Sequence, residues 1–443
     1  MREERNDARS AALRVLRQMD RAAAWADAGL DAELRRSGLA GQEAALAARL
    51  VYGVLQNRAL LDHYLGAYCS QKIDHLQKPL ADILRLGAYQ IVFLDRVPDS
   101  AAVNTSVELC RDCGRGQASG LVNAVLRKVA ANKENLPPVP EKDAVSYLAT
   151  RYSHPKWLVR RLLSLVGREE AEGFLRADNA PAPITVQTNT ILTTPEALRA
   201  SLEAEGVRVT PGLLPGSFQL RGTGNLTKLA AFQAGHFQVQ DDAAALVTEA
   251  MDLRGGEQVL DVCAAPGGKS FRCAMAMGDK GRIVACDLYE NKLRRIEAGA
   301  KRLHLTAIET AALDGRSFRA EWENAFDLVL VDAPCSGLGI IRKKPEIRYK
   351  KADDLFALPV VQTAILENAS RYVKPGGLLL YSTCTILLEE NGQVTDEFLA
   401  GHPDFRWEGF TLPIGEVPEG QITLWPQRQG TDGFYICRMR KAT

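Results

Sequence analysis

Hydrophobic residues recur at helical spacing along the first part of the chain. Leu13, Leu16 and Met19 would share one face of a helix, with Asn6 or Asp7 as its N-cap. The same spacing predicts helices over residues 9–19, 50–68, 80–94 and 121–129. We therefore expect an all-α domain at the start of the chain.

Prolines and a change of pattern divide the rest of the chain. Pro137, Pro138 and Pro140 stop the helical pattern, because proline has no backbone N–H and restricts the residue before it. We place the first domain at residues 1–138. Residues 144–235 indicate a small α+β module. Its predicted helices cover residues 156–166 and 195–205, and its predicted strands cover 184–189 and 217–220.

After residue 235 short apolar runs alternate with helical segments. The runs typical of buried strands cover residues 258–262, 281–286, 326–331 and 377–382. Helical patterns lie between them over residues 291–303 and 355–373, and residues 405–410 and 433–439 are predicted to add a closing hairpin. Such alternation predicts a mostly parallel sheet covered on both faces. The third domain, residues 236–443, is therefore predicted to be Rossmann-like α/β.

Composition is that of an ordinary soluble protein with several domains. The chain has 443 residues, of which 46% are hydrophobic and 25% charged, enough for two or three domains. Its start mixes both charge signs and has no apolar segment, so we expect no secretion signal. A cytoplasmic location is expected instead. The net charge of +1 argues against a diffusely basic nucleic-acid binder, although a small basic patch would escape this average.

The cysteines favour catalysis over disulfides or metal. Nine cysteines, an odd number, fit a reducing compartment. Cys110 and Cys113 have CxxC spacing, but no second CxxC or histidine pair accompanies them, so no metal site is expected. Cys335 and Cys384 each follow an apolar run that is typical of a buried strand. Both thiols should emerge at one rim of one sheet, where α/β enzymes keep their chemistry, which suggests covalent catalysis.

A glycine-rich turn lies in the segment Asp261-Val-Cys-Ala-Ala-Pro-Gly-Gly-Lys-Ser270. Its glycines let the backbone approach a ligand, and the helix expected from Lys269 offers free N–H groups. The segment is neither GxGxxG nor a Walker A loop, which argues against NAD and ATP. Asp287 ends the next apolar run, where a carboxylate can accept hydrogen bonds from ribose hydroxyls. With Asp314 as a third carboxyl, the pattern predicts a nucleoside cofactor.

Several motifs carry a family resemblance. They are Asp261 to Ser270, Asp332-Ala-Pro-Cys-Ser-Gly-Leu-Gly339, Ser382-Thr-Cys-Thr385, Gly235-His-Phe-Gln-Val-Gln-Asp241 and Asp432-Gly-Phe434. They resemble motifs of the RNA cytosine-5 methyltransferases of the Nop2/Sun family. The helical part, with Leu121-Val-Asn-Ala-Val-Leu-Arg127, resembles a NusB-like RNA-binding domain. The combination is similar to the bacterial Sun subgroup, which methylates cytosine 967 of 16S ribosomal RNA, and implies S-adenosyl-L-methionine as the methyl donor.

The resemblance also implies different roles for the two thiols. Carbon 5 of cytosine is a poor nucleophile until a thiolate has added to carbon 6. The family's nucleophile corresponds to Cys384, and Cys335 would assist release of the product. By position alone the two are nearly interchangeable, so this assignment rests on the resemblance. Asp332 directly precedes the Cys335 turn and is expected to reach the edge of the cytosine.

A cofactor pocket and an RNA-binding segment are implied as well. The expected cofactor contacts are Cys263, Ala264, Ala265, Pro266, Gly267, Gly268, Lys269, Asp287, Asp314 and Asp332. Lys269 is also placed to hydrogen-bond carboxylates or to lower a thiol pKa. The basic run 342–351 is expected to hold RNA phosphates, with Tyr349 for stacking, although such runs are usually solvated. Its expected contacts are Arg342, Lys343, Lys344, Arg348 and Tyr349.

Some positions depart from the family pattern. Thr385 stands where Ser is usual, Gln187 where Arg is expected, Thr105 where Glu is common, and residues 243–245 are alanines. Thr385 keeps the hydroxyl group of Ser, so it should not harm catalysis. The other departures affect details of the expected RNA contacts. The expected partner is small-subunit ribosomal RNA, free or partly assembled, with no membrane and no protein partner required.

Three alternative functions stay open at this point. The first is the same chemistry on transfer RNA, which the NusB-like part disfavours. The second is an RNA-binding assembly factor with a vestigial methyltransferase domain, although both thiol motifs are intact. The third is a redox or zinc protein, for which paired cysteine spacings are lacking.

Overall fold

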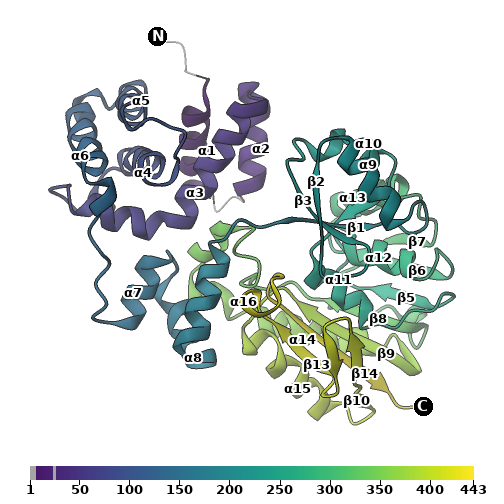
Figure 1. The fold of residues 1–443 in the computed structure, drawn as a ribbon. Helices are drawn as coiled ribbons and strands as arrows, with labels where there is room; N and C mark the ends of the chain where they lie inside the picture. Colours follow the sequence, from purple (N-terminus) through teal and green to yellow (C-terminus); the bar gives the residue numbers. More distant parts are fainter. Residues whose placement is uncertain (1–5, 23–25) are drawn as a thin grey trace. The chain divides into compact units, whose positions relative to one another are not determined.

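The computed structural model of the chain describes residues 6–22 and 26–443, which form two compact units (Figure 1). The first unit comprises the described residues up to 180 together with 341–350, and the second comprises 181–340 with 351–443. The three-domain boundaries inferred from the sequence stay a prediction. Within the described ranges, no helix is long and apolar enough to cross a membrane.

The first unit is helical, as predicted. Its longer helices are α1 (Ala8–Ala22), α2 (Ala26–Ser37), α3 (Gly41–Gly66), α4 (Lys78–Phe93), α5 (Asp99–Asp112), α6 (Ser119–Ala131), α7 (Ala144–Arg151) and α8 (Lys156–Asp178). Asp7 caps α1, because its Oδ1 accepts a hydrogen bond from the Ser10 amide at 2.8 Å. Helices α2 and α5 were not predicted, because many charged and small residues leave them only a weak apolar stripe.

The second unit begins with a small antiparallel sheet in the order β2-β3-β1-β4. Its elements are β1 (Ile184–Thr188), α9 (Pro195–Ala204), β2 (Arg208–Pro211), β3 (Ser217–Arg221) and β4 (Phe237–Val239). The predicted strands correspond to β1 and β3, whereas β2 and β4 have three or four residues and too little alternation to be predicted. Val186, Phe218 and Phe237 are buried in its core with Leu198 of α9.

A larger sheet forms the rest of this unit, in the order β10-β14-β9-β8-β5-β6-β7, with β13 beside β14. Its strands are β5 (Gln258–Asp261), β6 (Arg282–Asp287), β7 (Ile308–Ala312), β8 (Phe326–Asp332), β9 (Val373–Thr383), β10 (Phe405–Trp407), β13 (Gln421–Leu424) and β14 (Phe434–Lys441). Strands β5 to β9 run parallel, and β14 pairs antiparallel with β9 and β10. The predicted α/β class is confirmed.

The predicted closing hairpin is wrong in its connection. Strands β10 and β14 do pair, but β11 (Phe410–Leu412), β12 (Gly415–Val417) and β13 lie between them in the chain. Strand β7 was not predicted, because its five residues are only half-buried or exposed and lack a continuous apolar run. The pairing of β14 with β10 is therefore set by the tertiary structure and not by a short turn between them.

Helices cover both faces of the larger sheet. One face packs against α11 (Asp242–Glu249), α12 (Gly268–Ala276) and α13 (Glu290–Arg302). The opposite face packs against α14 (Leu358–Ser370) and α15 (Gly392–Gly401). Because successive residues of a strand face opposite sides and both sides are covered, each central strand contains an unbroken apolar run, such as residues 328–331 of β8. These strands were predictable for that reason.

The small sheet is fastened to α13 of the larger one. Arg302 Nη1 donates to the carbonyls of Phe232 and Phe237 at 2.9 and 3.0 Å. Asn189 Nδ2 donates to the carbonyls of Gly235 and Leu303 at 2.9 and 2.8 Å. Gly235 has a φ of +74°, and a Cβ at this position would overlap the carbonyl oxygen of Arg302. The approach therefore requires glycine.

We expect Gly235→Ala to lower the free energy of unfolding by about 3 kcal/mol, because overpacking costs ~1–3 kcal/mol and a left-handed backbone costs roughly 1–2 kcal/mol. Urea unfolding followed by circular dichroism measures the loss. Gly222→Ala is the matched control, since Gly222 also has a φ of +74° but nothing lies within 4 Å of its would-be Cβ. Equal losses in the two variants would contradict the close approach.

Candidate active site

Two cysteines meet where β8 and β9 end. In the parallel pairing of these strands Asp332 lies opposite Ser382, and the Ala333 amide donates to the Ser382 carbonyl at 2.9 Å. The turns that follow carry Cys335 and Cys384, whose sulfur atoms lie 3.3 Å apart. Both side chains are half-buried. The two thiols therefore emerge at one edge of the sheet, as their positions after two apolar runs predicted.

Cys335 is held in its protonated form. The hydrogen bond with Cys384, together with burial, raises the pKa of the Cys335 thiol well above its ordinary value. Cys335 therefore keeps its proton at neutral pH and is able to donate to the Cys384 sulfur.

Asp332 and Lys269 form a charged pair beside the thiols. Lys269 Nζ lies 2.6 Å from Asp332 Oδ2, and Ser382 Oγ donates to Asp332 Oδ1 at 2.8 Å. Burial disfavours the Lys269 ammonium, but the Asp332 carboxylate outweighs this effect and raises the pKa of Lys269 above its ordinary value. The ammonium also lies 4.9 Å from the centre of the Phe434 ring. Lys269 is therefore a permanent cation in this site.

A buried glutamate connects the two cysteine turns. Glu390 Oε2 accepts from the Ser336 amide at 2.8 Å and from Gln362 Nε2 at 2.9 Å. Its Oε1 accepts from Thr385 Oγ1 at 3.3 Å, and that hydroxyl also lies 2.7 Å from Ser336 Oγ. The residues directly after both cysteines are thus held by one carboxylate. Sequence reasoning missed Glu390, because an acidic pair before a helix has no distinctive pattern.

The glycine-rich turn lies at the neighbouring strand end, between β5 and α12. The Ala264 amide donates to the Cys286 carbonyl at 2.7 Å, which holds the turn against β6. Gly267 has a φ of +107°, and a Cβ there would overlap the ring of Phe271. Residues 263 to 269 therefore present backbone to the edge of the sheet, which suits close contact with a ligand.

Asp287 and Asp314 follow along the same edge. Asp287 ends β6 and lies 3.3 Å from Lys292 Nζ, and its carbonyl accepts from the Leu313 amide at 3.1 Å. Asp314 comes just after β7 and pairs with Arg316 at 2.7 Å. Strands β5, β6 and β7 are neighbours in the sheet, so the turn and both aspartates line one edge, and they fit a nucleoside.

Two exposed apolar residues extend the cofactor edge. Leu288 and Tyr289 directly follow Asp287 and are 50% and 56% exposed. Apolar side chains this exposed beside a carboxylate at a strand end suit the flat face of a base. Sequence reasoning missed them, although their place after the acidic residue was a usable signal.

The residues that depart from the family pattern lie in structural positions. Gln187 is buried, where its Nε2 donates to Asp242 Oδ1 at 2.9 Å and its Oε1 accepts from Arg272 Nη1 at 3.0 Å. Thr105 Oγ1 donates to the Ala101 carbonyl at 2.8 Å within α5. Ala243 and Ala245 are buried, whereas Ala244 is half-buried.

The predicted RNA-binding run folds with the first unit, and there the structure differs from the prediction. Arg348 is 1% exposed, and its guanidinium donates to the carbonyls of Gln56 and Ser153 and to Asn179 Oδ1, at 2.8 to 3.2 Å. A buried cation with these partners cannot contact phosphate, so Arg348 is structural. Arg342 is also buried.

The other predicted contacts in this run keep more exposure. Lys343 and Lys344 are half-buried, and Tyr349 is 40% exposed. The Tyr349 hydroxyl donates to the Leu55 carbonyl, and Arg58 lies 5.5 Å from the centre of its ring. Charge and spacing along the chain could not separate the buried cations of the run from the exposed ones.

Burial also changes the ionisation of Asp261, at the end of β5. Burial raises the pKa of Asp261 to about 7, against the hydrogen bond from Ser270 Oγ at 2.6 Å, which favours the charged form. The carboxyl below the cofactor turn is therefore largely neutral in mildly acidic solution.

We expect Asp261→Asn to change how stability depends on pH. Between pH 3.8 and about 7 the unfolded chain releases the Asp261 proton while the folded protein keeps it. This carboxyl therefore lowers the free energy of unfolding as pH rises through that window, by up to about 1.4 kcal/mol per pH unit. Urea unfolding at pH 4, 5, 6 and 7 measures this effect. The free energy of unfolding of the variant should rise relative to that of the wild type as pH increases. A difference that does not change with pH would contradict the raised pKa.

Removing the buried guanidinium should destabilise the first unit. We expect Arg348→Met to lower the free energy of unfolding by about 3 kcal/mol, because each buried acceptor left without a donor costs ~1–3 kcal/mol. Arg160→Met is the control, since Arg160 is exposed on α8. Thermal unfolding followed at the helix signal measures both, and equal stability would contradict the structural role.

Three known families match successive parts of the chain. A family described as 16S rRNA methyltransferase RsmB/F matches residues 248–440. The NusB family matches residues 6–131, and the ferredoxin-like domain of the RsmF/B-like methyltransferases matches residues 154–227.

Relatives match over nearly the whole chain. A protein of Bacillus subtilis named "Probable ribosomal RNA small subunit methyltransferase B" is 37% identical over 98% of each chain. A protein of Synechocystis with the same name is 33% identical over 98% of this chain and 99% of its own.

Solved structures match the fold as well. The protein PH0851 has a TM-score of 0.80 and 26% identity over 99% of both chains. A methyltransferase homologue of Pyrococcus horikoshii has a TM-score of 0.59 and 28% identity, covering 68% of this chain and 100% of its own.

Proposed function

Because the chain belongs to the RsmB/F family of 16S ribosomal RNA methyltransferases, we propose that it methylates carbon 5 of a cytosine in small-subunit ribosomal RNA. The proposed target is the equivalent of cytosine 967. S-adenosyl-L-methionine, when bound, supplies the methyl group. The observation that carries the proposal is the pair of cysteine sulfurs 3.3 Å apart at the edge of the sheet.

Cys384 is the proposed nucleophile. A thiolate is the attacking form of cysteine, and the sulfur that receives a hydrogen bond is the one better suited to carry that charge. The raised pKa of Cys335 keeps its proton in place, so Cys335 donates to Cys384. Addition of the Cys384 sulfur to carbon 6 makes carbon 5 of the base enamine-like and able to accept a methyl group.

Cys335 assists the second half of the reaction. Once carbon 5 carries the methyl group, its proton must pass to a base such as water. The electron pair of that C–H bond then restores the double bond between carbons 5 and 6, and the Cys384 sulfur leaves as a thiolate. Cys335 lies within hydrogen-bond distance of the departing sulfur, so it is placed to support that sulfur as the bond breaks. The carboxylate of Glu390 keeps the two turns together throughout, because it holds Ser336 and Thr385.

Asp332 and Lys269 orient the base. A carboxylate accepts hydrogen bonds from the amino group of cytosine, and from ring nitrogen 3 when the adduct is protonated. Lys269 holds Asp332 Oδ2 at 2.6 Å and Ser382 holds Oδ1 at 2.8 Å, so the carboxylate has one orientation. Lys269 also interacts electrostatically with Cys384. Asp332 is therefore proposed to orient the base, and the Lys269 ammonium is proposed to stabilise the negative charge of the Cys384 thiolate.

The rest of the edge is proposed to hold the methyl donor, and other parts of the chain are proposed to hold RNA. Residues 263 to 269 and Asp287 are the proposed contacts of the donor, with Asp314 near its base and Tyr289 against the base face. Lys343 and Lys344 are proposed to contact phosphate, and the helical first unit is proposed to bind RNA.

Methyl transfer from labelled S-adenosyl-L-methionine to small-subunit ribosomal RNA tests the function. We expect the wild type to label one cytosine, Cys384→Ala to give no detectable transfer, and Cys335→Ser to retain a covalent protein–RNA adduct that survives denaturing gels. The reason is that bond formation requires the first thiol, whereas release requires the second.

Cys69→Ser is the control, because Cys69 belongs to the other unit, and its transfer rate should equal that of the wild type. An adduct with Cys384→Ala but not with Cys335→Ser would exchange the two roles. Absence of label in any RNA, transfer RNA included, would refute the function.

A further inference from the structure

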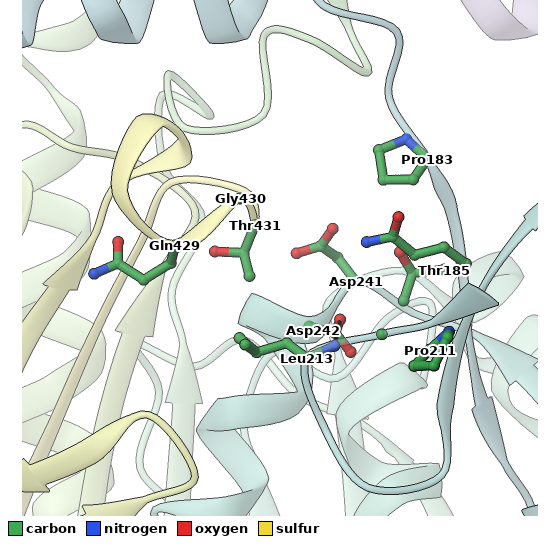
Figure 2. Close-up of a pocket in the computed structure, with 11 residues that line it drawn as sticks. Pro183, Thr185, Pro211, Leu213, Asp241, Asp242, Gln429, Gly430 and Thr431 are labelled. Atoms are coloured by element: carbon green, nitrogen blue, oxygen red, sulfur yellow. Dashed lines mark hydrogen bonds between the residues drawn. The ribbon is translucent and has the colours of Figure 1, made fainter.

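A pocket of about 230 Å³ opens in the second unit, beside the small sheet. Thr185 and Gln219 line it from β1 and β3, where they are directly paired. Asp241 and Thr431 lie on the other side, and Figure 2 shows the Asp241 carboxylate between Thr431 and Thr185. The volume lies below the ~300–1,000 Å³ of drug-sized sites, which suits one planar ring.

The pocket contains polar groups with unused hydrogen-bonding capacity. Thr185 is 4% exposed, and its hydroxyl has no hydrogen-bond partner within the described parts of the chain. The Gln219 amide likewise has none among those residues. Gln429 also lines the pocket, and its Oε1 accepts from the Trp425 amide at 2.7 Å. Both groups line the pocket, where they can form hydrogen bonds with a polar ligand.

The charge of the pocket excludes phosphate as that ligand. Asp241 and Asp242 are its charged lining residues, and no lysine, arginine or histidine lines it. Asp241 Oδ1 accepts from the amides of Ala243 and Asp432 at 2.9 and 3.1 Å, which fixes this carboxylate at the pocket. Carboxylates repel phosphate and accept hydrogen bonds from amino groups. A neutral ring that carries an amino group fits.

Backbone contacts connect the pocket to the catalytic turn. Two residues beyond Thr431, the Gly433 amide donates to the Gly339 carbonyl at 2.8 Å. The Gly339 amide in turn donates to the Cys384 carbonyl at 3.0 Å. The segment that carries Thr431 is therefore joined through Gly339 to the turn that carries the proposed nucleophile.

We propose that this pocket receives the base of a nucleotide flanking the target cytosine, and that it selects a base with an exocyclic amino group over uracil. The inference rests on the proposed function. Enzymes that act on an extruded base take their sequence context from contacts to the adjacent nucleotides, and single-stranded bases are read along their edges by hydrogen bonds. Asp241 and Gln219 supply those contacts here.

The test uses short RNAs that contain the target cytosine, with each of the two flanking nucleotides changed in turn to uridine. We expect uridine at one of these positions to raise KM about tenfold with kcat little changed, since one base contact discriminates by ~1–3 kcal/mol. Gln219→Met should lose most of this discrimination. Asp241→Asn introduces an N–H donor that a uracil carbonyl can accept, so the difference in KM between the amino-bearing base and uracil should become smaller. The amide oxygen of the variant can still accept the hydrogen bond from the Ala243 amide at the start of α11.

Gln393→Met is the matched control, because Gln393 is exposed on α15, and it should discriminate as the wild type does. If the wild type methylates all flanking variants with one KM, the inference is overturned and the proposed function stands. Unchanged discrimination in Gln219→Met and Asp241→Asn also overturns it. If no RNA is methylated by the wild type, the proposed function itself fails.

Discussion

The parallel pairing of β8 with β9 is the constraint on which the catalytic edge depends. Because parallel strands end at the same edge, Asp332 opposite Ser382 sets both following turns at one height, and the cysteine sulfurs lie 3.3 Å apart. A shift of one residue along a strand is about 3.3 Å, enough to end a hydrogen bond between the sulfurs. The Glu390 carboxylate and the Gly339 amide fasten the two turns in that register.

The acids at this edge have different partners. Asp332 lies against the Lys269 ammonium, and Glu390 accepts hydrogen bonds from groups of both turns. Asp261 has a single hydroxyl donor among the side chains, and burial raises its pKa to about 7. A carboxylate away from water stays charged only with a cation or several donors beside it.

Elements with long apolar runs could be predicted from the sequence, and short polar ones could not. Strands β5, β6, β8 and β9 have central residues that are buried on both faces of the sheet, so each strand contains an unbroken apolar run. Strand β7 has Glu309 and Thr310 on exposed or half-buried positions, and its pairing with β6 determines it as a strand. The Arg348 cation was misassigned for a related reason, since a basic run does not reveal which side chain will be buried.

The sequence by itself determined the family, the α/β class, the glycine turn and the presence of two thiols at strand ends, because motifs and apolar runs are local properties of the chain. Only the tertiary structure decided that Cys335 keeps its proton, because the Cys335 pKa depends on the contact with Cys384 and on burial. It also decided the structural role of Arg348 and the pocket at Thr185. Burial and partner geometry come from segments far apart in the chain, and no local pattern encodes them.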